Sequence, residues 1–315
     1  MKNITAYIIV ASVLVFACDP DVDIPGNEKV DSYSKVYMTQ AEGGAKNYTY
    51  GISDESEHLI LGATYGGMDY PSSDVVINID VDDQLVAEYN SANGTSYPVL
   101  PHEAYEVSGN EVIIPSGEVS SSLINMTINT QEGAMIPFEE YMVAAQITNV
   151  SDGVTLNTEL QTAYFILEYE PLIPRSAWEV VSFSTEEPAE GDNGGLVSST
   201  FDDDDNTFWH SQWSGGEAPP PHWFILDMGE IYTLHGLSIL TRQSDNSGKP
   251  ENIVVEISED GDTWTEGGSY NLENTSDLQR VFFTTGFNKP ARYFKVTVNS
   301  SYNAGYTHMA EIYAF

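Results

Sequence analysis

Hydrophobic and polar positions alternate along several segments of the first half of the chain. The alternation is clear in 75–81 (VVINIDV), in 123–128 and in 164–167, and it has the two-residue period of half-buried β-strands. Turn-forming residues at 108–110 separate the later strands. The pattern therefore predicts an antiparallel β-sandwich in residues 32–169.

One segment of this region follows a different pattern. Asp82 or Asp83 is placed to cap a helix that runs through Leu85, Val86 and Tyr89. Gly94 follows at the position where a helix ends in a left-handed residue. We expect one short helix on the first sandwich.

The second half of the chain begins after a proline-bracketed linker. Pro171 and Pro174 enclose the linker 170–174, after which aromatic residues become more frequent and turn residues recur between short segments. The apolar run at 223–226 (WFIL) has the length of a buried strand. A second all-β domain is predicted in residues 175–315.

A hairpin is predicted inside this second domain. Asp260 and Gly261 provide its turn, and the partner strands are 254–258 and the segment from Trp264 onward. Large aromatic side chains dominate core energetics. We therefore expect Trp209, Trp223 and Trp264 to be mostly core residues rather than ligand platforms.

Charge narrows the classes of partner. The 315 residues include 11 Lys and Arg against 48 Asp and Glu, for a formal net charge of -37. Such a charge repels phosphate backbones and anionic lipid headgroups, so nucleic acid is excluded as a partner. Cations, basic proteins and neutral ligands such as sugars are compatible with this charge.

The start of the chain has the organisation of an export signal. A short basic start precedes the apolar run 4–17, which is too short for the roughly 20 residues that cross a bilayer, so 1–17 is predicted to be a signal peptide. The sequence LVFAC at 14–18 resembles the lipobox of bacterial lipoproteins, although Phe16 replaces the usual small residue. This resemblance implies lipidation of Cys18, the only cysteine; the alternative is a buried thiol.

The residues after Cys18 suggest where the protein is displayed. The segment 18–31 is acidic and poor in apolar residues, which is typical of a spacer that does not fold. Acidic residues at this place resemble the surface-display signal of Bacteroidetes lipoproteins. The resemblance implies an outer-membrane, cell-surface location, with membrane contact only through the lipid anchor.

The first domain has a family resemblance that carries no chemistry. Residues 86–105, with Tyr89-Asn90, Gly94-Thr95 and Tyr105, resemble a domain of unknown function at the N-termini of Bacteroidetes surface lipoproteins. The resemblance implies a spacer role. His102 and Glu103 are adjacent, and adjacent side chains of an extended segment point apart, so we do not expect a catalytic pair there.

The second domain resembles a better-known family. Three stretches occur in family order: FDDDDNTFWH at 201–210, WFILDMG at 223–229 and SEDGDTW at 258–264. With 310–312 (AEI), they resemble the coagulation-factor type C, or discoidin, family, which includes family-32 carbohydrate-binding modules. The resemblance implies a galactose-binding-like jelly roll that binds ligands at loops. The expected fold class is all-β, with two β-sandwich domains in tandem.

The resemblance also implies a structural calcium ion. Asp202, Asp204 and Thr207 match a family loop that wraps Ca²⁺ together with Glu311 from the last strand. Oxygen ligands of this type suit a hard cation, and converging carboxylates repel each other without one. A solvated acidic turn is the alternative interpretation of the aspartate run.

The residues implied in sugar binding lie in the predicted loops. His210, Arg242 and Asn246 match the polar set of galactose-binding members, with Tyr302 or Tyr306 as the stacking platform. Asn246 lies one residue off the usual spacing from Arg242. The alternatives are a backbone-capped loop histidine at His210, and an ion pair of Arg242 with Asp245 or Glu251.

No catalytic motif of the common enzyme classes occurs, although 48 acidic residues always offer carboxylate pairs at glycosidase spacing. We therefore predict a non-enzymatic lipoprotein that binds carbohydrate, of galactose type or as a host or dietary glycan, through its C-terminal domain. The alternative is a protein-binding or adhesive subunit that meets other outer-membrane proteins of a glycan-uptake complex without contacting sugar itself.

Overall fold

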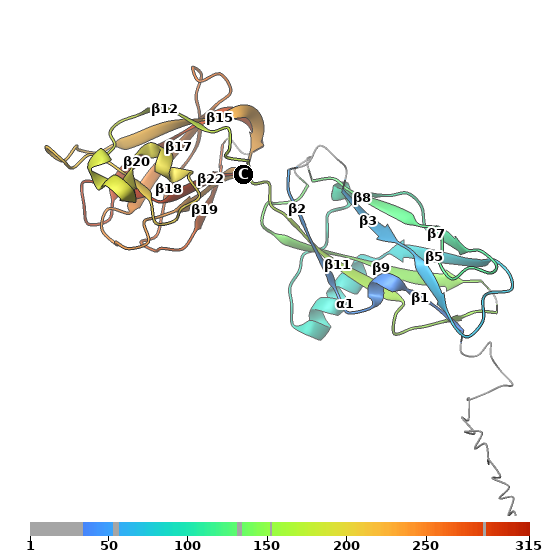
Figure 1. The fold of residues 1–315 in the computed structure, drawn as a ribbon. Helices are drawn as coiled ribbons and strands as arrows, with labels where there is room; N and C mark the ends of the chain where they lie inside the picture. The colour runs from blue at the N-terminus through green and yellow to red at the C-terminus, as the bar shows by residue number, and fades with distance from the viewer. Residues whose placement is uncertain (1–33, 53–56, 131–133, 152, 286–287) are drawn as a thin grey trace, which may run out of the picture.

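The computed structural model describes residues 34–52, 57–130, 134–151, 153–285 and 288–315, which form two lobes joined beside the end of the chain (Figure 1). The predicted signal peptide, Cys18 and the acidic spacer lie outside these described residues. Within the described ranges, none of the helices has both the length and the apolar character needed to span a bilayer.

The first lobe is a β-sandwich built from three sheets. A five-stranded sheet in the order β2-β11-β9-β5-β7 shares one hydrophobic core with two three-stranded sheets, β10-β1-β4 and β3-β8-β6. The strands are β1 (Lys35–Met38), β2 (Lys46–Tyr50), β3 (Glu57–Leu61), β4 (Ala63–Gly66), β5 (Val75–Val81), β6 (Tyr105–Val107), β7 (Glu111–Ile114), β8 (Ile124–Ile128), β9 (Glu140–Val150), β10 (Thr155–Leu156) and β11 (Thr162–Tyr169). The three predicted strands correspond to β5, β8 and β11.

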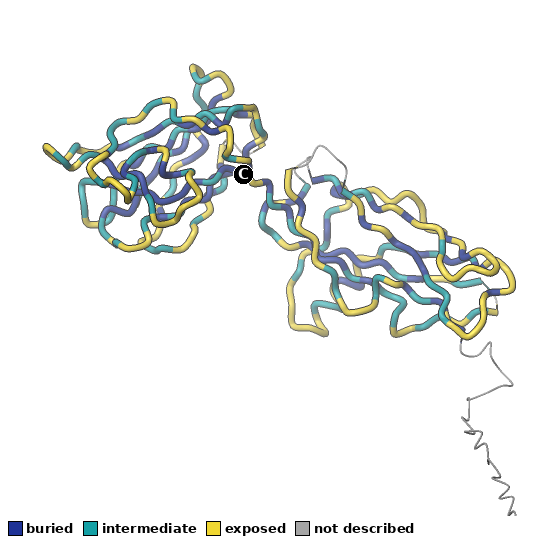
Figure 2. Tube along the Cα trace, in the orientation of Figure 1, coloured by how far each residue is buried: buried dark blue, intermediate teal, exposed yellow. Residues whose placement is uncertain are grey.

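Alternation of side chains explains why these segments are strands. In β5 the residues Val75, Ile77 and Ile79 are buried, and the residues between them are half-buried. Successive side chains of a strand point to opposite faces, so every second residue reaches the core. Figure 2 shows buried positions recurring along the strands of both lobes.

The predicted helix forms with the predicted caps. Helix α1 (Asp83–Asn93) begins after Asp82, whose side chain accepts a hydrogen bond from the Gln84 backbone N–H at 2.9 Å. Gly94 ends the helix with a φ of 68°, the left-handed conformation that costs glycine least. Leu85 and Val86 pack on the outside of the five-stranded sheet in a small cluster of their own.

The second lobe is also all-β, as predicted. Its five-stranded sheet β12-β15-β20-β17-β18 shares a core with the sheet β19-β16-β22, and a third sheet has the order β13-β14-β21. The strands are β12 (Glu179–Phe183), β13 (Gly194–Gly195), β14 (Phe208–His210), β15 (His222–Leu234), β16 (Gly236–Leu240), β17 (Pro250–Ser258), β18 (Thr265–Asn271), β19 (Gln279–Phe282), β20 (Lys289–Ser301), β21 (His308–Met309) and β22 (Glu311–Ala314). The short 3₁₀ helices of the two lobes are η2 (Thr39–Ala41), η3 (His102–Ala104), η4 (Pro188–Asn193) and η5 (Val197–Thr200).

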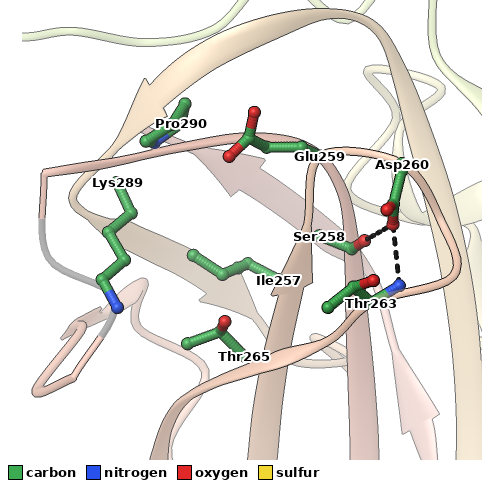
Figure 3. A pocket seen from close by; sticks show the side chains of 8 residues that line it. All are labelled: Ile257, Ser258, Glu259, Asp260, Thr263, Thr265, Lys289 and Pro290. Atoms are coloured by element: carbon green, nitrogen blue, oxygen red, sulfur yellow. Dashed lines mark hydrogen bonds between the residues drawn. The ribbon is translucent and has the colours of Figure 1, made fainter.

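The predicted hairpin joins β17 and β18. Asp260 accepts hydrogen bonds from the Thr263 backbone N–H and the Ser258 hydroxyl (Figure 3). It also accepts one from the Asp262 backbone N–H, and these bonds lower its pKa to about 2. Gly261 follows with a φ of 81°. A hollow of about 410 Å³ opens beside this turn, and its lining includes none of the predicted sugar-binding residues. Asp260 therefore serves to hold the turn.

The three tryptophans expected in the core divide into two groups. Trp209 is fully buried and meets Phe224 edge-on at 5.1 Å between ring centroids. Trp223 and Trp264 are only half-buried, so the prediction was wrong for them. Trp223 precedes the buried Phe224 in β15 and therefore points to the opposite face of the sheet, where Lys295 Nζ lies 5.7 Å from its ring centroid.

The linker between the lobes is part of the packed structure. Pro171 is buried, and Ile173 is buried in the second core, where its backbone N–H donates to Ala314 O at 3.0 Å. From the first lobe, Phe138 reaches across to Phe315 and Arg280 of the second. The two lobes therefore meet through side-chain contacts as well as through the chain.

Candidate functional site

Three loop-bordering segments of the second lobe bring the predicted polar residues together. His210 ends β14, and the β14–β21 register places it opposite His308. The Tyr306 ring lies 5.1 Å from the His210 ring, with an interplanar angle of 30°. Arg242 follows β16. Its charge contributes to lowering the pKa of both histidines, which indicates that it lies near them.

His210 is a neutral side chain with one nitrogen already engaged. Its Nδ1 lies 2.6 Å from the Ser211 carbonyl oxygen, which assigns the ring proton to Nδ1 and leaves Nε2 as an acceptor. Burial is the main cause that lowers the pKa of His210. The backbone capping considered from sequence is therefore present, and it leaves Nε2 available to accept from a ligand hydroxyl.

Arg242 is held by an aromatic ring rather than by a carboxylate. Its guanidinium carbon lies 4.0 Å from the Phe208 ring centroid, a cation–π arrangement. Its Nε is buried without a hydrogen-bond partner, and within the described parts of the chain no ion pair joins Arg242 to Asp245 or Glu251. The guanidinium is thus positioned with unused donor capacity.

His308 lies behind this pair and has an unsatisfied nitrogen. Its Nε2 lies 2.6 Å from Ser247 O, so Nε2 carries the proton and Nδ1 is an acceptor. Nδ1 is buried without a hydrogen-bond partner. Burial lowers the pKa of His308 to about 4, and the nearby Arg242 charge acts in the same direction.

The two candidate tyrosines have different environments. Tyr306 lies against Gly248, which has a φ of 78°, and a Cβ at that position would collide with the tyrosine ring. The Tyr306 hydroxyl pairs with the Ser247 hydroxyl at 3.0 Å. Tyr302 instead donates to Leu272 O at 2.9 Å, so its hydroxyl is already engaged. Asn246 is exposed in the same loop as Ser247.

A buried glutamate organises the neighbouring loop, and sequence analysis did not single it out. Glu187 is 1% exposed and accepts from the backbone N–H groups of Trp213 and Ser214, at 2.8 and 2.6 Å, and from the Ser214 hydroxyl. Burial favours protonation, yet these hydrogen bonds outweigh it and lower the pKa of Glu187 to about 2. The ionised carboxylate therefore fixes the backbone of the loop.

This loop presents an exposed tryptophan at the site. The Trp213 side chain is 44% exposed, and its indole N–H donates to Glu190 Oε1 at 2.8 Å. Charge interactions of Glu190 and Glu187 with His210 place all three close together. Sequence analysis had assigned Trp213 no role. The sequence did not indicate Glu187 or Glu190 as site residues, because nothing in it distinguishes these two from the other acidic residues among the 48.

The residues of the predicted calcium site are only partly convergent. Thr207 Oγ1 donates to both Asp202 carboxylate oxygens and to Asp204 O, whereas the Asp204 carboxylate accepts from the Asn206 backbone and side-chain N–H groups. Within the described parts of the chain, no group of three or more His, Cys, Asp or Glu side chains is arranged to hold a metal ion. Glu311 is fully buried beside Asp202, and its Oε1 has no hydrogen-bond donor.

The unpaired Glu311 oxygen makes this place a fit for a cation. Burial, with a further contribution from Asp202, raises the pKa of Glu311 to about 7 despite the opposing effect of Arg175. A proton or a cation between these two carboxylates would relieve their repulsion. Asp202, Glu311 and the Thr207 hydroxyl are oxygen donors of the kind that Ca²⁺ binds.

Arg175 connects the same loop to the last strand. Its side chain is 8% exposed and donates to Glu311, to Asp203 and to Ile312 O. The guanidinium carbon also lies 4.1 Å from the Tyr313 ring centroid. A fixed cation of the protein thus joins the aspartate loop to β22, a role that the sequence interpretation had given to calcium alone.

Comparison with known proteins places both halves of the chain. Residues 181–312 match the F5/8 type C domain family, and residues 31–154 match the profile of an N-terminal domain. The second lobe is therefore an F5/8 type C, or discoidin, domain, and the resemblance inferred from its motifs is confirmed. The predicted all-β architecture with a discoidin-like jelly roll is likewise confirmed.

Curated relatives align with the second half of the chain. A sialidase of Micromonospora viridifaciens is 30% identical over 145 residues, which are 45% of this chain and 22% of the sialidase. A galactose oxidase of Gibberella zeae is 31% identical over 149 residues, which are 45% of this chain and 20% of the oxidase. The chain thus spans about a fifth of the length of these relatives.

Among solved structures, the family-32 carbohydrate-binding module of the Clostridium perfringens protein NanJ, in complex with galactose, is 23% identical. The likeness covers 45% of this chain and 96% of the module, with a TM-score of 0.40.

Proposed function

We propose that this chain is a non-catalytic lipoprotein that binds carbohydrate, of galactose type or as a host or dietary glycan, through the loops around His210, Arg242 and Tyr306. The observation that carries the proposal is the unused hydrogen-bonding capacity at one place: the Arg242 guanidinium, His210 Nε2 and the buried His308 Nδ1. Buried polar groups without partners are uncommon in native structures, and a polar ligand would satisfy them.

The chemistry of this set suits a neutral sugar. Arg242 supplies planar donors that can hold two neighbouring hydroxyls, and His210 Nε2 accepts from a third. Tyr306 and the exposed Trp213 offer aromatic faces to the apolar C–H side of a ring. Asn246 in the adjacent loop is exposed and able to join. We also retain Tyr302 as a proposed contact, although its hydroxyl bonds elsewhere.

The F5/8 type C assignment and the relatives support the same class of ligand. A sialidase and a galactose oxidase, both named for action on sugars, carry a segment similar to this lobe within much longer chains. The similarity concerns only about a fifth of those enzymes, so the binding role is proposed here without their catalysis.

Affinity electrophoresis of the full chain in gels that contain galactosides or mucin glycans tests the sugar site. We expect retardation of the wild type and its loss in Arg242→Ala, which removes the donors. Arg292→Ala is the matched control, because Arg292 pairs with Asp227 on the sheet and should leave retardation unchanged. Absence of retardation on every glycan would instead favour the alternative, a protein-binding or adhesive subunit of a glycan-uptake complex.

We propose further that a structural Ca²⁺ binds at Asp202, Thr207 and Glu311, with Asp204 contributing through its carbonyl oxygen. The ion would neutralise the facing carboxylates beside the fixed Arg175 charge. Thermal unfolding with and without a chelator tests this: calcium should raise the wild-type midpoint and leave Asp202→Ala unchanged. Equal midpoints for the wild type in both conditions would remove calcium from the proposal.

The proposed location is the outer-membrane surface, through a lipid on Cys18. It rests on the sequence of the leader alone. Metabolic labelling with a radioactive fatty acid should mark the wild type and not Cys18→Ser. Labelling of both proteins, or of neither, would contradict lipidation at this residue.

A further inference from the structure

A cavity of about 280 Å³ lies at the joint between the two lobes, and none of the loop-site residues is among those that line it. Its lining combines residues of the first lobe, the linker and the second lobe. They are Phe138, Glu170, Leu172, Asp205, Ser238, Leu240, Leu278, Arg280 and Tyr313. Ligand sites occur preferentially at such domain interfaces, and this volume lies near the lower end of their range of roughly 300 to 1,000 Å³.

The floor of the cavity is the outer face of a sheet. In the register of β19-β16-β22, Ser238 stands opposite Arg280 on one side and Tyr313 on the other, so the three side chains form one row. Leu237 and Ile239, their neighbours in β16, point into the second core instead. Strand alternation thus directs a polar row toward the first lobe.

Ser238 provides an observation that points to a ligand. It is 1% exposed, it lines the cavity, and its hydroxyl has no hydrogen-bond partner. A buried hydroxyl without a partner is less favourable than a paired one, because it has lost its hydrogen bonds to water. A ligand hydroxyl in the cavity would remove this cost.

The wall above this row is built by Phe138 and the linker. Arg280 lies with its guanidinium carbon 4.0 Å from the Phe138 ring centroid, which fixes its donors at the edge of the cavity. Glu170 and Asp205 add carboxylate acceptors. Two carboxylates against one guanidinium disfavour an anionic ligand, while the apolar side chains of Leu240 and Leu278 offer a surface for C–H groups.

We propose that this joint cavity binds one neutral monosaccharide unit, as a second carbohydrate subsite apart from the loop site. A single pyranose ring has the required combination of hydroxyls, which donate and accept, and an apolar face. The size of the cavity limits the occupant to about one ring. The subsite does not depend on the loop site, because the two have no lining residue in common.

Saturation-transfer NMR on the full chain, with the methyl glycosides of galactose, glucose and N-acetylglucosamine as probes, tests the subsite. Measurements are made in the wild type and in the Arg242→Ala background, which removes the proposed loop site. At least one probe should still give a signal, and adding Leu278→Trp, which fills the cavity, should weaken its binding about tenfold or more. Leu123→Trp is the matched control, because Leu123 is also an exposed leucine but lies on the first lobe.

The outcomes separate this proposal from the loop site. Binding that survives Arg242→Ala and is lost with Leu278→Trp supports the joint subsite, whatever the fate of the loop site. Binding that is unaffected by Leu278→Trp overturns it, as does the loss of every probe signal in Arg242→Ala alone. If wild type and Arg242→Ala bind equally while Leu278→Trp does not, the proposed loop site is the one that fails.

Discussion

The Phe138 ring meets the Phe315 ring edge-on, at 4.9 Å between centroids and an interplanar angle of 89°. Arg280 lies 4.0 Å from the centroid of the same Phe138 ring. Phe138 adopts a φ of 62°, a conformation that is strained for a bulky residue and that persists where the surroundings determine it. Phe138 thus makes both contacts with the second lobe from a costly backbone conformation.

Phe138→Ala should therefore uncouple the two lobes. The backbone strain stays, because alanine also has a Cβ, while the aromatic and cation–π contacts are lost, at about 1–2 kcal/mol together. We expect calorimetry of the variant to resolve two unfolding transitions, one for each lobe, whereas unfolding of the two lobes is more strongly coupled in the wild type. Phe183→Ala, at a partly exposed phenylalanine outside the joint, is the control, and identical traces for the two variants would contradict this expectation.

Gly248→Ala tests the support under Tyr306. The change places a methyl group inside contact distance of the Tyr306 ring and strains a backbone with a φ of 78°. Gly261→Ala is the matched control, because its φ of 81° carries the same strain while its nearest neighbours lie at an ordinary 3.5 Å. The backbone strain should cost each variant about 1 kcal/mol of stability, and only Gly248→Ala should weaken retardation on glycans. Equal retardation of the two would exclude Tyr306 from the site.

Glu187 should make the free energy of unfolding depend on pH over a defined acidic range. Its pKa is about 2 in the folded chain against an ordinary 4.5, so the unfolded state binds the proton first as the pH falls. The contribution is fully present above about pH 4.5 and is lost as the pH falls toward about 2. Glu187→Gln does not titrate at this position. Its free energy of unfolding, measured with urea, should therefore fall less than that of the wild type over this pH range. Parallel curves would contradict the role given to the carboxylate.

His308 should also make the protein less stable as the pH falls, but over a higher pH range than Glu187. Burial holds the pKa at about 4 against 6.5, so the folded state favours the neutral ring. Its contribution is fully present above about pH 6.5 and is lost as the pH falls toward 4. His308→Gln keeps a donor for Ser247 O without titrating, so its free energy of unfolding should change less between pH 7 and 4.5. His58→Gln, at an exposed histidine of the first lobe, should behave like the wild type, and equal pH dependence of all three proteins would exclude His308 as the cause.

The local elements of this protein could be predicted from its sequence, because their causes are local. Alternation gave β5, β8 and β11, and the caps at Asp82 and Gly94 gave helix α1 its limits. The Asp260–Gly261 turn gave the β17–β18 hairpin. Each depends on residues a few positions apart, whose backbone geometry and hydrogen bonds do not need the rest of the fold.

The sequence by itself also determined the acidic charge and the F5/8 type C motifs, and it named His210, Arg242 and Tyr306. Only the tertiary structure decided what surrounds them. It turned Glu187 inward beneath Trp213, set Arg175 between Asp203 and Glu311, and closed a cavity over Ser238 at the joint. The hydrogen bonds among these contacts join residues 26 to 136 positions apart. They depend on how distant loops pack together, and the local pattern of polar and apolar residues contains no information about that packing.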